Sequence, residues 1–86
     1  MGDDLISVTI TNREQIVFKG VVKSLTSINS RGEFDILGRH QNFISLIYQK
    51  IILIPVEGKP VTYEIDQGIL HVLKNEVKVF LGIGKG

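Results

Sequence analysis

The sequence predicts an all-β fold, a sandwich or barrel of short strands in a single domain. Apolar and polar residues alternate with a period of two, as in residues 6–10, because successive side chains of a strand point to opposite faces. Turn-forming residues recur about every eight to twelve positions, and no helical pattern lasts beyond a turn or two. The length of 86 residues is that of one small domain.

Four strands are expected in the first half of the chain. Gly20 interrupts a β-branched run and suggests a bulge or a tight bend. Residues 11–13 and 28–32 are turn clusters. Residues 42–50 could form one helical turn, but their β-branched content favours a strand. The expected strands are residues 6–10, 15–25, 34–37 and 43–48.

Four more strands are expected in the second half. Pro55 should end a continuous apolar run or place it at a sheet edge, because proline cannot donate to a ladder. Gln67 and Gly68 should break the alternation, and residues 74–76 should form a three-residue hairpin connection. The expected strands are residues 51–56, 61–66, 69–73 and 77–81. The phenylalanines lie in apolar runs and are expected in the core: Phe18, Phe34, Phe43 and Phe80.

The composition excludes several classes of protein. A net charge of +1, from ten basic and nine acidic residues, leaves no electrostatic footprint for nucleic acid. The chain has no cysteine, so disulfides, thiol catalysis and thiolate metal sites are excluded. The apolar run of residues 51–56 is much shorter than the about 20 residues of a spanning helix. The acidic N-terminus matches neither a secretory signal nor a myristoylation signal, so a cytosolic chain is expected.

No enzyme activity, cofactor or metal site is expected. Glu33, Asp35, His40 and His71 could do acid–base chemistry, but no nucleophile or standard ligand spacing accompanies them. His71 should face solvent on a strand whose neighbours face the core. The glycine-rich tail lacks the spacing of a phosphate-binding loop. The segment from residue 29 to residue 45 mixes glycine, both charges and a histidine, and is interpreted as a protein-contact region.

A series of short motifs runs in order along the chain. Their positions are residues 6–10, Glu14, Phe18 to Gly20, Val22 to Leu25, Gly32 to His40, Phe43 to Ile47, Gly68, Ile69, Val72 and Val77 to Leu81. This order resembles the N-terminal β-sandwich domain of the epsilon subunit of F-type ATP synthases. That family has an alternating strand, an acidic turn, a Phe-x-Gly step, a signature running from Gly-Glu to Pro-Gly-His, and a final hairpin. The resemblance covers about residues 5–82.

Four departures from the family pattern bear on its loops. Asp35 stands where the family usually has glycine, and Gly38-Arg39 replaces Pro-Gly before His40. Proline presets a turn and glycine permits positive φ, so the loop before His40 is expected to take a different path. Residues 48–50 replace a Lys-Pro-Gly turn, and Gln67 replaces the first glycine of a pair.

The resemblance implies a flattened β-sandwich of about ten short, mostly antiparallel strands. The domain would span residues 1–82, followed by a flexible tail over residues 83–86. The helical hairpin that follows this domain in the family has no counterpart in the sequence. Whether it was removed or is naturally absent stays open.

The implied function is mechanical rather than catalytic. The domain would join the central stalk of a proton- or sodium-driven ATP synthase, binding the gamma subunit and the ring of c subunits. It would lie at the cytoplasmic face of the membrane, peripherally, through the complex. Arg31, Gly32 and Glu33 would face the polar loops of the ring. His40, Ser45 and Asn12 would face gamma. The alternative is a small β-sandwich adaptor for an unrelated protein, with no role in ATP synthase.

Overall fold

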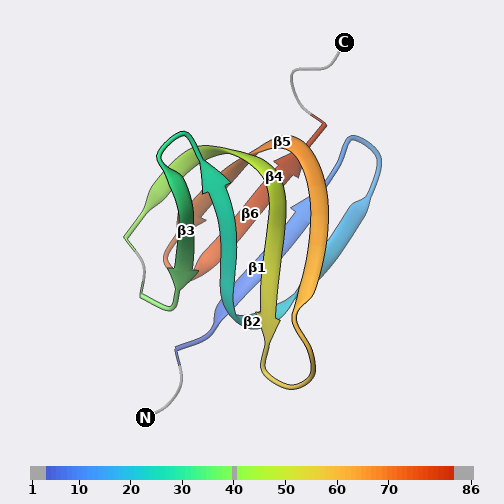
Figure 1. Cartoon of the computed structure of the whole chain (residues 1–86). Coiled ribbons are helices and arrows are strands. Elements are labelled where there is room, and N and C mark those ends of the chain that lie inside the picture. Colours follow the sequence, from blue (N-terminus) through green and yellow to red (C-terminus); the bar gives the residue numbers. More distant parts are fainter. Residues whose placement is uncertain (1–3, 40, 83–86) are drawn as a thin grey trace.

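The computed structural model describes residues 4–39 and 41–82, which contain six strands and no helix (Figure 1). This confirms the all-β class. The described part of the chain therefore contains no helix that could cross a membrane. The strands are β1 (Ile6–Thr11), β2 (Ile16–Asn29), β3 (Gly32–Leu37), β4 (Phe43–Pro55), β5 (Val61–Leu73) and β6 (Glu76–Leu81).

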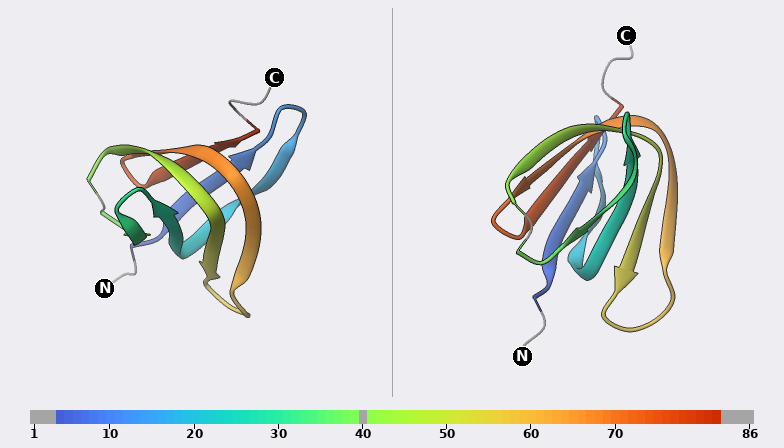
Figure 2. Two further views of the ribbon diagram at one scale, coloured as in Figure 1. Left: turned by 45° about the horizontal axis from the view of Figure 1, so that its top comes forward. Right: turned by 60° about the vertical axis from the view of Figure 1, so that its left-hand side comes forward.

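The strands form one sheet that closes on itself. Its order is β1-β6-β5-β4-β2-β3, and β1 also pairs with β2. All pairings are antiparallel except that of β1 with β6, which is parallel. The closed sheet is flattened into two layers, which the two views of Figure 2 show from different sides. The mostly antiparallel sandwich is therefore confirmed.

Three long strands, β2, β4 and β5, belong to both layers. The N-terminal part of β2 pairs with β1 in the rear layer of Figure 1, and its C-terminal part pairs with β3 and β4 in the front layer. The N-terminal part of β4 and the C-terminal part of β5 run in the rear layer. Their other halves complete the front layer.

The count of about ten strands, which the resemblance implied, is wrong, because the described residues form six. The eight strands expected from the sequence itself exceed this number by two, because two predicted breaks fall inside continuous strands. Residues 43–48 and 51–55 lie in one strand, β4, whose register shifts at Tyr48 and Gln49. Residues 61–66 and 69–73 join in β5. A strand that passes from one layer to the other must bend, and bulges provide the bend without ending the strand. In the sequence, the two halves of such a strand resemble two separate short strands, because the predicted break falls where the strand passes between the layers.

Two local predictions also need correction. Gly20 forms no bulge, because it pairs in register with Val8. A Cβ there would lie 3.2 Å from Cζ of Phe18, so the missing side chain makes room for that ring. The last hairpin connection is two residues rather than three. Lys74 and Asn75 both have positive φ, which is the requirement of the tight turn that matches strand twist.

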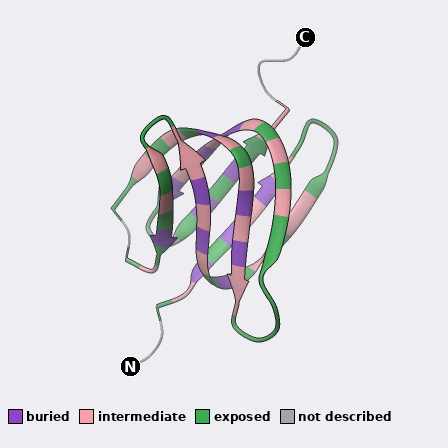
Figure 3. Ribbon diagram, in the orientation of Figure 1, coloured by how far each residue is buried: buried purple, intermediate pink, exposed green. Residues whose placement is uncertain are grey.

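The core lies between the two layers and follows the alternation of the strands (Figure 3). In β1, Ile6, Val8 and Ile10 are buried and the residues between them are not. Isoleucine, leucine and valine make up the whole buried apolar set, as the scarcity of aromatic residues predicts. The remaining members are Val22, Leu25, Ile36, Ile47, Ile51, Leu53, Leu70, Val72, Val77 and Val79.

Two aromatic pairs connect strands that are not neighbours in the sheet. Phe18 on β2 meets Tyr63 on β5 edge to face, with ring centroids 6.5 Å apart. Phe34 on β3 meets Phe43 on β4 in the same way at 5.7 Å. Each pair joins the two layers where no backbone ladder does, and such pairs add about 0.5–1.5 kcal/mol beyond their buried area.

Phe80 contradicts the prediction that all four phenylalanines belong to the core. The other three are half-buried and pack against the core, whereas 42% of Phe80 is exposed. Its neighbour Val79 is buried, so the alternation of β6 points Phe80 outward.

We expect Gly68→Ala to destabilise the fold by about 1–3 kcal/mol, the usual cost of overpacking. Gly68 lies where β5 passes into the rear layer, and a Cβ there would be 2.9 Å from the backbone oxygen of Phe80. Urea unfolding of the variant measures the loss. Gly20→Ala is the comparison, because its Cβ would meet only the ring of Phe18, which can shift. Equal stability of Gly68→Ala and the parent would contradict the inference that β6 leaves no room for a side chain at residue 68.

Candidate partner-binding surface

The β2–β3 turn projects from the sandwich and presents Arg31 to solvent. Asn29 pairs with Gly32 across the turn, so only Ser30 and Arg31 connect the two strands. The Asn29 side chain accepts a hydrogen bond from the Arg31 backbone N–H at 2.9 Å, which fixes the turn locally. Gly32 has φ of 120°, a conformation that suits glycine. Gly32 thus has a structural role in shaping the turn.

Ser45 lies beside this turn although it is distant in sequence. The Asn29 side-chain amide donates a hydrogen bond to the Ser45 hydroxyl oxygen at 3.3 Å. The same hydroxyl donates to the carbonyl of Leu46 at 2.9 Å. The structure therefore brings four of the six predicted contact residues into one area: Arg31, Gly32, Glu33 and Ser45.

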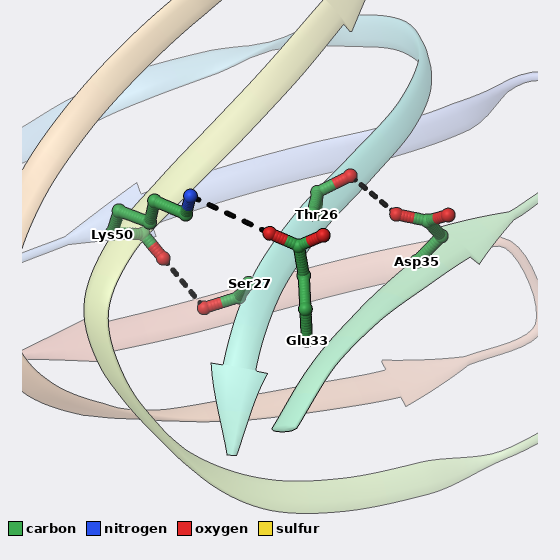
Figure 4. A network of polar contacts seen from close by, with 5 residues as sticks. All are labelled: Thr26, Ser27, Glu33, Asp35 and Lys50. Carbon is green, nitrogen blue, oxygen red and sulfur yellow. Dashed lines mark hydrogen bonds and ion pairs between the residues drawn. The ribbon is translucent and has the colours of Figure 1, made fainter.

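Polar contacts hold the acidic residues of β3 on the outer face of the front layer (Figure 4). Lys50 Nζ on β4 lies 3.4 Å from a carboxylate oxygen of Glu33. Asp35 accepts a hydrogen bond of 2.5 Å from the hydroxyl of Thr26. The side chains of Lys50 and Glu33 are 36% and 60% exposed, so solvent screens the pair, and it orients Glu33 more than it stabilises the fold.

Ser27 supports Lys50 from inside the sandwich. Its hydroxyl is fully buried and donates to the backbone carbonyl of Lys50 at 2.7 Å. The β2–β4 register passes from Ser27 opposite Ile51 to Ile28 opposite Tyr48, which leaves residues 49–50 without partners in β2. Gln49 has φ of 73° at this bulge. The hydroxyl thus satisfies a carbonyl that the bulge removes from the ladder.

Asn12 lies apart from this cluster, in the β1–β2 turn. Its side-chain oxygen accepts hydrogen bonds from the backbone N–H groups of Glu14 at 2.9 Å and Gln15 at 3.0 Å. Its own backbone N–H donates to the carbonyl of Gln15. Asn12 therefore shapes its own turn, and no contact connects it with the β2–β3 turn among the described residues.

His40 lies outside the described residues, but the loop around it is tied to two other segments. The Arg39 backbone N–H donates to the side-chain oxygen of Asn75 at 2.7 Å, and Lys74 donates in the same way to Asn42 at 3.1 Å. Arg39 Nε also lies 3.1 Å from a carboxylate oxygen of Asp4.

The departure from Pro-Gly in this loop has a local structural explanation. Arg39 takes a left-handed φ of 66°, the kind of conformation for which glycine is usually selected. Gly38 packs against the N-terminal segment, where a Cβ would lie only 2.4 Å from the backbone oxygen of Asp4. Glycine at 38 is therefore required by close packing rather than by its own φ.

The four residues weighed for acid–base chemistry do not form a cluster among the described positions. Glu33 and Asp35 share the outer face of β3, as their spacing predicts. His71 lies on β5, half-buried between buried neighbours on the strand, and pairs with Ile44 and Lys78. No group of three histidine or acidic side chains in residues 4–39 and 41–82 could hold a metal ion.

Sequence reasoning missed the roles of the residues that organise this surface. Asn29 begins the predicted contact segment and Lys50 lies outside it, but neither had a predicted role, because only the pairing of β2 with β4 brings them beside Ser45 and Glu33. Exposed Ile44, Leu46 and Phe80 were hidden in apolar runs. The alternation of side chains along β6 could have indicated that Phe80 points outward, because Val77 and Val79 occupy the inward positions of that strand.

Fold and surface together define a small all-β sandwich domain with hydrogen-bonded turns and exposed charged side chains. Residues 5–82 match the model of a family described as "ATP synthase, Delta/Epsilon chain, beta-sandwich domain". The chain belongs to this family.

The chain is similar to curated ATP synthase epsilon chains. It is 32% identical over 74 residues to that of a Nitratiruptor species, covering 85% of this chain and 57% of the relative. It is 31% identical over 75 residues to that of a Helicobacter pylori strain, covering 87% and 61%. The chain thus spans less than two thirds of the length of these relatives.

Two solved ATP synthases contain chains with the same fold. A chain in the cryo-EM structure of the Euglena gracilis mitochondrial enzyme superposes with a TM-score of 0.84 at 22% identity, covering 91% of this chain and 51% of that one. A chain of the Tetrahymena thermophila central stalk and c-ring structure gives 0.73 at 12% identity, covering 88% and 62%. At such identities the likeness concerns the fold alone.

We expect Ser27→Ala to destabilise the protein by about 1–3 kcal/mol, because it leaves the Lys50 carbonyl without its donor. Thermal and urea unfolding measure the change. Ser24→Ala is the matched control, since Ser24 lies on the same strand away from the bulge at Gln49 and is only half-buried. Similar losses in the two variants would mean that the bulge does not depend on Ser27.

Proposed function

We propose that this chain is a non-catalytic part of the central stalk of an F-type ATP synthase. It binds the gamma subunit on one side and the c-ring on the other, and so couples ring rotation to ATP synthesis. It is peripheral to the membrane, at its cytoplasmic face, and reaches it through the complex. Membership of the delta/epsilon family over residues 5–82 carries this proposal.

The β2–β3 turn is the proposed contact with the ring. Arg31 and Glu33 present opposite charges at a tip that hydrogen bonds from Asn29 and an ion pair from Lys50 hold in place. Charges so arranged suit contacts to polar loops, where they steer association and set register more than they raise affinity. Gly32 contributes the shape of the turn rather than a contact.

The proposed contact with gamma comprises Ser45, His40 and Asn12. Ser45 lies between Ile44 and Leu46, whose exposed side chains point to the opposite side of β4. Asn12 has used its side-chain oxygen within its own turn, so only its amide N–H groups are available to a partner.

The first test is titration calorimetry of this chain with purified gamma subunit from the same source. Binding tighter than about 1 μM, about −8.2 kcal/mol, is expected, and His40→Ala should weaken it. A folded chain that shows no binding at tens of micromolar would contradict the stalk assignment. The adaptor function would then replace it.

Charge reversal at Glu33 tests the ring contact. Glu33→Lys should weaken co-sedimentation with purified c-ring about tenfold, because it replaces the negative charge beside Arg31 by a positive one. Lys50→Met is the control, since it also removes the Glu33–Lys50 ion pair but keeps the Glu33 carboxylate. Equal weakening by both variants would mean that the ion pair, and not the ring, requires Glu33.

A further inference from the structure

The loop of residues 38–42 crosses from the front layer to the rear layer without a ladder of its own. Leu37 pairs with Ser24 in the front layer, and Phe43 pairs with Val72 in the rear layer. None of the described residues between them belongs to a strand. The loop also contains no proline that would preset its path. Its conformation therefore depends on contacts with other segments of the chain.

Two asparagine side chains tie this loop to the β5–β6 turn in a reciprocal way. The side-chain oxygen of Asn75, in the turn, accepts a hydrogen bond from the backbone N–H of Arg39, in the loop, at 2.7 Å. The side-chain oxygen of Asn42, in the loop, accepts one from the backbone N–H of Lys74, in the turn, at 3.1 Å. Each segment thus supplies one donor and one acceptor, and the pair of hydrogen bonds is here called the asparagine clamp.

Asn75 is the central member of the asparagine clamp. It is half-buried, whereas Asn42 is exposed. Its backbone carbonyl accepts a hydrogen bond from the N–H of Ser7 at 2.9 Å, so Asn75 joins the start of β1, the β5–β6 turn and the loop of residues 38–42. Its φ of 55° is left-handed, and asparagine adopts this region more readily than most residues other than glycine. Asn75 therefore combines a suitable backbone with a short side chain that carries an acceptor.

Arg39 is the residue that the asparagine clamp restrains most directly. Its φ of 66° is left-handed, a conformation that costs a residue with a side chain more than it costs glycine. Such a conformation persists where the surrounding contacts over-determine it. Asp4 lies 3.1 Å from Nε of Arg39, but this ion pair acts through a side chain that is 80% exposed. The hydrogen bond to Asn75 acts on the backbone itself.

We propose that Asn75 is a positioning residue for the β3–β4 loop and that it forms one cooperative unit with Asn42. The two hydrogen bonds connect the same two segments, so each keeps the donor and the acceptor of the other close together. Loss of either one therefore loosens both. A partner that binds the ordered loop has less conformational entropy to remove. That last step rests on the proposed function, in which the loop contributes to the gamma contact, whereas the asparagine clamp itself does not.

Amide hydrogen exchange of the folded chain, followed by NMR, tests the asparagine clamp without any partner. Asn75→Gly removes one acceptor and keeps a residue suited to positive φ, and Asn42→Ala removes the other acceptor. Each variant should speed exchange of both the Arg39 and the Lys74 amide, by about five- to tenfold. Acceleration of only the amide that lost its own acceptor, or of neither, would overturn the cooperative unit. Should Asn75→Gly fail to fold, exchange of the Arg39 amide in Asn42→Ala decides.

Two further variants separate the acceptor from the rest of the side chain. Asn75→Asp keeps a side-chain oxygen and tolerates positive φ, so both amides should exchange as slowly as in the parent. Fast exchange in this variant would mean that the acceptor does not hold the loop. Asn12→Ala is the matched control, since Asn12 accepts hydrogen bonds from the backbone of Glu14 and Gln15 in its own turn. It should speed exchange of those two amides alone.

Titration calorimetry with gamma tests whether the ordered loop serves a partner. Asn75→Gly should weaken binding about fivefold, and Asn75→Asp should restore it. Faster exchange with unchanged affinity for gamma would overturn the role of Asn75 in partner binding. A parent chain that does not bind gamma would contradict the proposed function, and the exchange rates would still decide whether Asn75 positions the loop. Failure of the proposed function and failure of this inference are therefore separate results.

Discussion

The fold depends on one constraint, that three strands must belong to both layers. β2, β4 and β5 can do so only if their backbones bend without losing the ladder, because an unpaired buried backbone group is costly. The bulge at Gln49 provides one bend, and the buried hydroxyl of Ser27 replaces the hydrogen bond that the bulge removes. In β5 the register skips Asp66, which provides another irregularity, and at nearby Gly68 the backbone of β6 leaves no room for a side chain.

The class of fold could be predicted from the sequence because alternation reports local geometry. Val8 and Ile10 are buried because every second residue of β1 points to the core, as their spacing in the sequence indicates. The number of strands could not be predicted in this way. Residues 48–50 and 67–68 have the composition of turns, and only the pairing of β4 with its neighbours shows that they are bends within strands.

The candidate surface could be predicted in part. The turn at Arg31 and the outward direction of Glu33 follow from local signals. The partners that position them, Asn29 and Lys50, required knowledge of which strands meet. The same holds for the separation of charge between the two faces, because composition counts Lys78 and Glu64 together although they lie on opposite sides of the core.

One strand has a mechanical consequence for a rotating assembly. β2 starts just after the turn of Asn12 and ends at the turn of Arg31, the proposed contacts with gamma and with the ring. Its 14 residues amount to about 46 Å of chain at about 3.3 Å each. Torque between the two proposed partners would then load the covalent bonds of β2, and also the Asn29–Ser45 hydrogen bond, which joins the β2–β3 turn directly to another proposed gamma contact. The ladders on both sides of β2 would keep that strand in place under the load.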